Sequence, residues 1–69
     1  MQFFEYVTGE TEKAIRTGMG GWIPKSQIVE MRETDERSKP CKIGRATYNG
    51  IPHEITVTQH FAEKMGWIQ

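Results

Sequence analysis

The chain has 69 residues, among them nine Lys or Arg, nine Asp or Glu and one Cys. A domain this small buries only about 60% of the surface of its unfolded chain, which leaves little volume to enclose a substrate and disfavours an enzyme. The balanced charge provides no overall field toward nucleic acid or acidic membranes, and a lone cysteine excludes an intrachain disulfide.

These limits lead us to expect a single domain over residues 1–69 in the cytoplasm. No stretch approaches the roughly 20 apolar residues of a membrane span, so we expect no membrane partner. The first five residues have neither a basic segment nor a long apolar run, so we expect no signal peptide.

Short strands are predicted along the first part of the chain. Residues 2–8 are rich in aromatic and β-branched side chains and end at Gly9, which predicts a strand. Residues 12–17 predict a second, shorter strand. The glycine-rich residues 18–21 predict a hairpin turn, because glycine readily adopts positive φ. A third strand begins with residues 22–23.

Pro24 interrupts this third strand. It has no N–H for a strand ladder, but it fits the first position of a helical turn. Residues 25–27, Lys-Ser-Gln, predict one such turn before residues 28–31 resume as strand. A turn inside a strand allows a short sheet to change direction, as a small barrel requires. Residues 32–40, with three basic and three acidic side chains, predict a mobile charged loop and no basic arm that reaches for phosphate.

Asn49-Gly50 is the strongest local signal in the chain. This dipeptide is typical of a type I′ turn between two strands, here residues 42–48 and 51–58. The two-residue loop sets a register in which Arg45 lies opposite Glu54 as an ion pair.

A short helix is predicted to close the chain. Thr58 is a suitable N-cap, Phe61 and Met65 lie four apart on one face, and Gly66 is a natural helix stop. The apolar residues 67–68 can fold back onto the helix.

Together these elements predict a mainly β, β-rich α+β fold. We expect a small, strongly bent antiparallel sheet of five strands, or an SH3-like or OB-like barrel, with a short C-terminal helix. The predicted core is built around the aromatic residues Phe3, Phe4, Tyr6, Trp22, Tyr48, Phe61 and Trp67.

The residues available for catalysis or metal binding are few. Cys41 has no C-x-x-C companion, and His53 and His60 lie on different predicted elements. Structural zinc requires four closely arranged ligands. We therefore expect no metal, no cofactor and no enzymatic activity. Cys41 is expected to be a small apolar residue, His53 to be half-buried beside Ala46, and His60 to be exposed.

Four residues are the candidate binding residues: Arg16, Trp22, Lys25 and Gln27. Trp22 is either a buried corner of the fold or an exposed recognition surface. We expect the corner, because so short a chain has few large apolar side chains to spare. Arg16, Lys25 and Gln27 then form the contact surface. The alternative is a small barrel that binds single-stranded nucleic acid, with Trp22, Lys25 and Arg16 as a stacking platform. The balanced charge favours a protein partner.

Several segments resemble small phage and prophage accessory proteins. They are Lys13-Ala14-Ile15, the run Trp-Ile-Pro-Lys-Ser-Gln-Ile at 22–28, Ile55-Thr56-Val57 and residues 62–66. The chain departs from that pattern in having glycines and Met19 where a polar turn is expected. The resemblance implies a phage-borne protein that binds a host or phage protein stoichiometrically, as an inhibitor of a host defence complex would. It supplies no catalytic residues.

Overall fold

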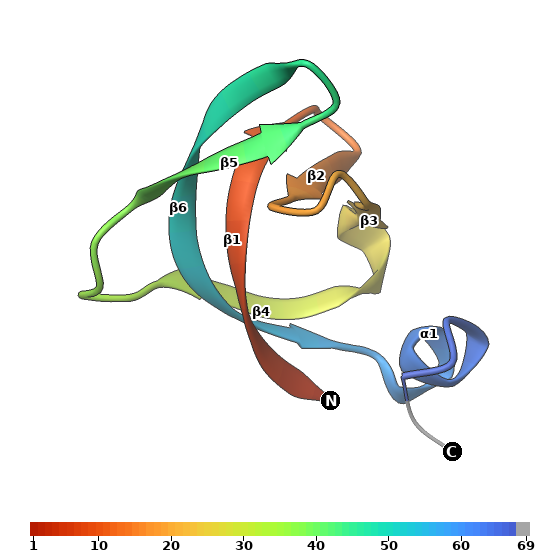
Figure 1. Ribbon diagram of the computed structural model, residues 1–69. Coiled ribbons are helices and arrows are strands. Elements are labelled where there is room, and N and C mark those ends of the chain that lie inside the picture. Colours follow the sequence, from red (N-terminus) through yellow and green to blue (C-terminus); the bar gives the residue numbers. More distant parts are fainter. Residues whose placement is uncertain (68–69) are drawn as a thin grey trace.

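Six strands and one short helix make up residues 1–67, the part of the chain that the computed structural model describes (Figure 1). The elements are β1 (Gln2–Glu10), β2 (Ala14–Thr17), β3 (Trp22–Pro24), β4 (Ile28–Glu33), β5 (Lys39–Ile43), β6 (Ala46–Val57) and α1 (Gln59–Lys64). A 3-10 turn, Lys25–Gln27, connects β3 to β4, as predicted. The mainly β class, the bent antiparallel sheet and the C-terminal helix are confirmed.

The sheet curls because its two outermost strands are consecutive in the chain. The strand order is β3-β2-β1-β6-β4, and every pairing is antiparallel. The 3-10 turn therefore carries the chain from one edge of the sheet to the other. The predicted number of five strands is wrong for this reason: β3 and β4 are two strands with different partners, not one interrupted strand.

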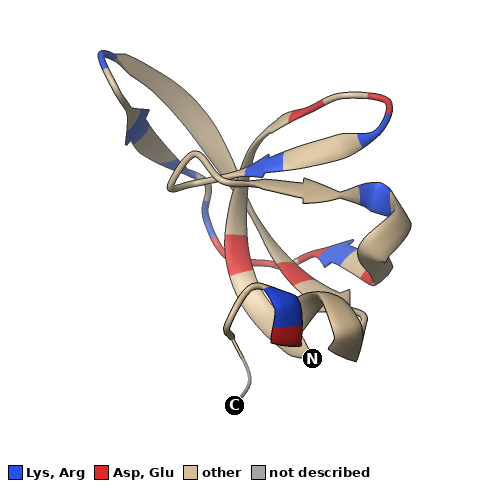
Figure 2. Cartoon of the chain, turned by 90° about the vertical axis from the view of Figure 1, so that its right-hand side faces the viewer, with Lys and Arg blue, Asp and Glu red and all other residues tan. Residues whose placement is uncertain are grey.

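β6 is the longest strand, and its two halves pair with different strands. Residues 51–56 of β6 pair with β1 on one side, and residues 53–57 pair with β4 on the other. Residues 46–50 pair with β5 instead. The tip of the β5–β6 hairpin extends away from the rest of the sheet, at the upper left of Figure 2. The body of the hairpin packs on β1 and β2, with Lys39 over the ring of Tyr6 and Tyr48 on the guanidinium of Arg16.

The hairpin turn lies at Gly44-Arg45, where Ile43 pairs with Ala46. Gly44 has a φ of 61°, and no non-glycine residue among those described has positive φ. Positive φ at the first central residue alone fits a type II′ turn. The predicted turn at Asn49-Gly50 is therefore wrong, since both residues lie inside β6.

The corrected register changes two other predictions. Arg45 lies in the turn and does not oppose Glu54; the Glu54 carboxylate instead accepts a hydrogen bond from Arg32, with 2.9 Å between Nη2 and Oε2. The predicted loop 32–40 shrinks to residues 34–38, because its ends belong to β4 and β5.

The core is aliphatic rather than aromatic. Its buried members are Val7, Ile15, Ile23, Ile55, Val57, Phe61 and Ala62. Of the predicted aromatic core only Phe61 is buried, and Phe3 packs against the cluster from its edge. Three others, Phe4, Trp22 and Trp67, expose 44%, 49% and 39% of their surface. β-Branched side chains suit the narrow inner face of a small curled sheet better than large rings do.

The helix is capped at both ends as predicted. Thr58 Oγ1 accepts a hydrogen bond from Phe61 N at 3.2 Å. Gly66, with a φ of 78°, donates from its N–H to the carbonyl of Glu63, and the N–H of Trp67 donates to the carbonyl of Ala62. These two bonds define a Schellman motif.

Trp67 folds back, as expected for the residue after a glycine stop. Its ring lies edge-on to Phe61 and Phe3, with centroid separations of 5.5 and 5.2 Å. Met65 is 49% exposed, so only Phe61 of the predicted helical pair enters the core. Ile68, the other residue expected to fold back, lies outside the described residues.

Gly50 supplies a test of the corrected register. A Cβ added there would lie 2.5 Å from Cys41 Sγ and 3.0 Å from Tyr6 Cβ. We predict that Gly50→Ala lowers the free energy of unfolding by about 1–3 kcal/mol, the range typical of overpacking. Gly21→Ala is the matched control, because its Cβ would meet only Thr17 Oγ1 at 3.6 Å. Urea denaturation measures both, and an unchanged midpoint for Gly50→Ala would contradict the close packing of β5 on β6.

Candidate binding site

Trp22 lies on the surface, which corrects the prediction of a buried corner. Successive residues of β3 point to opposite faces of the sheet, and Ile23 occupies the inward position with 2% of its surface exposed. Trp22 and Pro24 therefore point outward. Trp22 remains 49% exposed at an edge of the strand order.

Arg16 lies directly opposite Trp22 on β2 and is held in place from several sides. Its guanidinium carbon is 3.8 Å from the ring centroid of Tyr48 and 5.7 Å from that of Trp22. Its Nε donates to Thr8 Oγ1 at 3.1 Å, and Nη2 donates to the Thr8 carbonyl at 3.0 Å. Stacking and hydrogen bonds together fix the planar group, so Arg16 presents a pre-positioned cation between two aromatic rings.

The other two candidate residues are engaged elsewhere. The Lys25 ammonium forms an ion pair with the exposed carboxylate of Glu10, and this hydrogen bond lowers the pKa of Glu10. Gln27 Oε1 accepts a hydrogen bond from Thr58 Oγ1 at 2.8 Å, and the Gln27 carbonyl accepts from Thr58 N at 3.0 Å. Gln27 thus ties the 3-10 turn to the start of α1. The structure brings Arg16 and Trp22 together but gives Gln27 a structural role.

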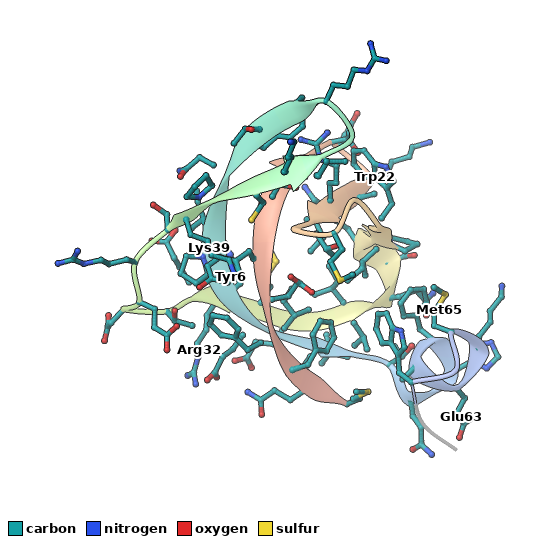
Figure 3. The ribbon with its side chains drawn as sticks, in the orientation of Figure 1. Tyr6, Trp22, Arg32, Lys39, Glu63 and Met65 are labelled. Atoms are coloured by element: carbon teal, nitrogen blue, oxygen red, sulfur yellow. The ribbon has the colours of Figure 1, made fainter. Side chains whose placement is uncertain are left out.

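An apolar groove of about 520 Å³ adjoins Trp22. It lies between the start of β1, the β2–β3 turn and the end of α1. Its apolar walls are Met1, Phe3, Met19, Trp22, Ile23, Met65 and Trp67. Trp22 and Met65 lie on the same side of the molecule (Figure 3). Met19 is the most exposed of the wall residues, at 90%, and Glu5 has the one charged side chain among the described residues that line the groove.

Sequence reasoning missed most of this groove. Met19 did provide a signal, because an apolar residue at the tip of a glycine-rich turn is unusual unless it contacts something. Met1, Met65 and Trp67 come from the two ends of the described chain, and no local pattern indicates that the fold brings those ends together.

The histidines and the cysteine are not gathered into one site. Cys41 is buried, and His60 is exposed on α1, as expected. His53 is half-buried, but it lies opposite Glu5 and Glu33 rather than beside Ala46. Within residues 1–67, no group of three or more His, Cys, Asp or Glu is close enough to hold a metal ion.

Comparison of the chain with protein-family models, curated proteins and solved structures returned no match. No helix within residues 1–67 has the length and apolar character needed to cross a membrane. Functional inference therefore rests on the chemistry of the surfaces described above.

The exposure of Trp22 generates a stability prediction. Trp22→Ala should lower the free energy of unfolding by about 1–2 kcal/mol, because only about half of the Trp22 surface is buried. Ile23→Ala, next to it in the chain, should cost about 2–5 kcal/mol, as for other buried Ile residues. Urea denaturation followed by far-ultraviolet circular dichroism compares the two. Equal losses would restore the buried-corner interpretation of Trp22.

Proposed function

We propose that this chain is a non-enzymatic binding protein of phage type, which acts by stoichiometric contact with a host or phage protein. The observation that carries the proposal is the apolar groove of about 520 Å³, with Met19 standing 90% exposed at its rim. Large apolar side chains gathered on the surface of a small domain indicate an interaction site.

The residue types of the groove suit protein recognition. Tryptophan and methionine are enriched in the centres of protein interfaces, and tryptophan is over-represented among the residues that dominate binding energy. Trp22 and Trp67 supply rigid apolar walls, while the methionines supply flexible side chains that adapt to a partner. Complete burial of a side chain such as Met19 contributes about 1.5–3 kcal/mol.

Charge in the groove disfavours the alternative of a nucleic-acid site there. Glu5, which has the one charged side chain among the described lining residues, would repel phosphate. Lys25 is paired with Glu10, and Arg16 lies at the rim beside Trp22. An apolar segment of a partner protein fits this groove better. Occupation of a subunit of a host defence complex is the mode of action that the phage resemblance implies.

Met19→Glu tests the proposal with little risk to the fold, because Met19 is almost fully exposed. We expect the tagged protein to capture one partner protein in stoichiometric amount from nuclease-treated lysate of the producing cells. Met19→Glu should reduce that capture at least about tenfold, since a carboxylate in an apolar interface is costly to desolvate.

Val29→Glu is the control, because Val29 is an apolar residue 68% exposed on β4 that does not line the groove. It should retain the partner. Equal capture by both variants, or loss of the partner on nuclease treatment, would contradict the proposed function.

A further inference from the structure

The charges of this neutral chain are segregated in the fold. Residues 37–53 contain four basic residues, Arg37, Lys39, Lys42 and Arg45, and no Asp or Glu. The rest of the chain therefore has five basic and nine acidic residues. Lys39, Lys42 and Arg45 lie on β5 or in its turn, Arg37 lies in the loop just before β5, and basic segments follow the hairpin out from the sheet (Figure 2).

These hairpin cations are not neutralised within residues 1–67. The two ion pairs there, Lys25–Glu10 and Arg32–Glu54, involve none of them. All four are exposed. The Lys39 ammonium lies 4.5 Å from the ring centroid of Tyr6, a contact that leaves its charge available to an anion. The basic surface ends at the foot of the hairpin, where Glu33 and Glu36 line a shallow depression with Asn49.

Aromatic rings adjoin this basic surface. Tyr48 belongs to β6 of the hairpin, opposite Cys41, and its ring stacks on the guanidinium of Arg16. The same guanidinium lies over Trp22, whose ring is half exposed. Arg16 thus connects Tyr48 of the hairpin to the exposed ring of Trp22.

We propose that the β5–β6 hairpin binds single-stranded nucleic acid. Lys39, Lys42 and Arg45 contact the phosphates, and an unpaired base stacks on Trp22 beside Arg16. Proteins that bind single strands without sequence preference combine a positively charged track with aromatic stacking residues. A duplex offers phosphates but keeps its base faces stacked inside, so it would leave Trp22 unused. This inference goes beyond the proposed protein-binding function and does not depend on it.

Fluorescence anisotropy with a labelled oligothymidylate of about 20 nucleotides tests the inference on the whole chain. Three phosphate contacts, one for each of Lys39, Lys42 and Arg45, predict about a 20-fold loss of affinity between about 50 and 200 mM salt, from a log–log slope of about −0.7 per contact. Replacing Lys42 and Arg45 together by Glu should reduce affinity at least tenfold and lower the magnitude of that slope. Trp22→Ala should reduce affinity about fivefold or more through lost stacking.

Two controls make the result specific. Replacing Lys13 and Lys64 together by Glu changes the net charge equally at exposed positions outside the hairpin, and should alter affinity by no more than about threefold. Val29→Glu, which places a carboxylate on β4 rather than on the hairpin or beside Trp22, should leave oligonucleotide binding unchanged. Circular dichroism verifies that each variant is folded.

The inference is overturned if the oligonucleotide does not bind at low salt, or if the Lys13/Lys64 control loses as much affinity as the hairpin variant. The single-strand assignment is overturned if a duplex of the same length binds with an affinity equal to or higher than that of the oligothymidylate. Equal binding of polyglutamate would identify the hairpin as an unselective polyanion surface and would also overturn it.

Discussion

The architecture depends on one strand, β6, which pairs with three others. Its second half is hydrogen-bonded to β1 and β4, and its first half to β5. A strand paired on both sides belongs to the interior of the sheet, whereas the half that pairs only with β5 turns out of it and carries β5 across β1 and β2. The twist of a long antiparallel pair separates the two halves further. The protruding hairpin and the closed body are thus consequences of a single pairing pattern.

The size of the core explains the character of the surface. A curled sheet of short strands encloses a narrow interior, and isoleucine and valine from β1, β2, β3 and β6 fill most of it. The tryptophans must then lie at the periphery, where they form the walls of a groove rather than a core. The Schellman motif after α1 fixes Trp67 on one side of that groove, and the β2–β3 hairpin places Trp22 on the other.

Local signals of the sequence predicted local structure well. The Thr58 cap, the Gly66 stop and the turn at residues 25–27 were all predictable, because each depends on the chemistry of neighbouring residues. Asn49-Gly50 misled because Gly44, six residues earlier, offered a competing turn, and β6 requires Gly50 for close packing against Cys41. Which glycine makes the turn is decided by β1 and β4, whose pairing with β6 is not visible in the local sequence.

The candidate site was predictable only in part, for a related reason. The Arg16–Trp22 pair follows from one short hairpin and was found from sequence. The groove requires residues from both ends of the described chain, so no window of sequence contains it. The distribution of charge was also not predicted. The equal numbers of acidic and basic residues do not reveal that the fold places basic residues on the hairpin and most acidic residues elsewhere. Net charge is a property of the whole chain, whereas a partner interacts with the charges on the surface that it contacts.

The packing of Cys41 has a consequence for how the hairpin can be observed. Its Sγ is enclosed near Gly18 and Gly50, at positions where even an added methyl group would be crowded. A thiol reagent is much larger than a methyl group, so it can reach this sulfur only after the hairpin detaches from the sheet. The alkylation rate of the one thiol in the chain therefore measures how often the hairpin opens.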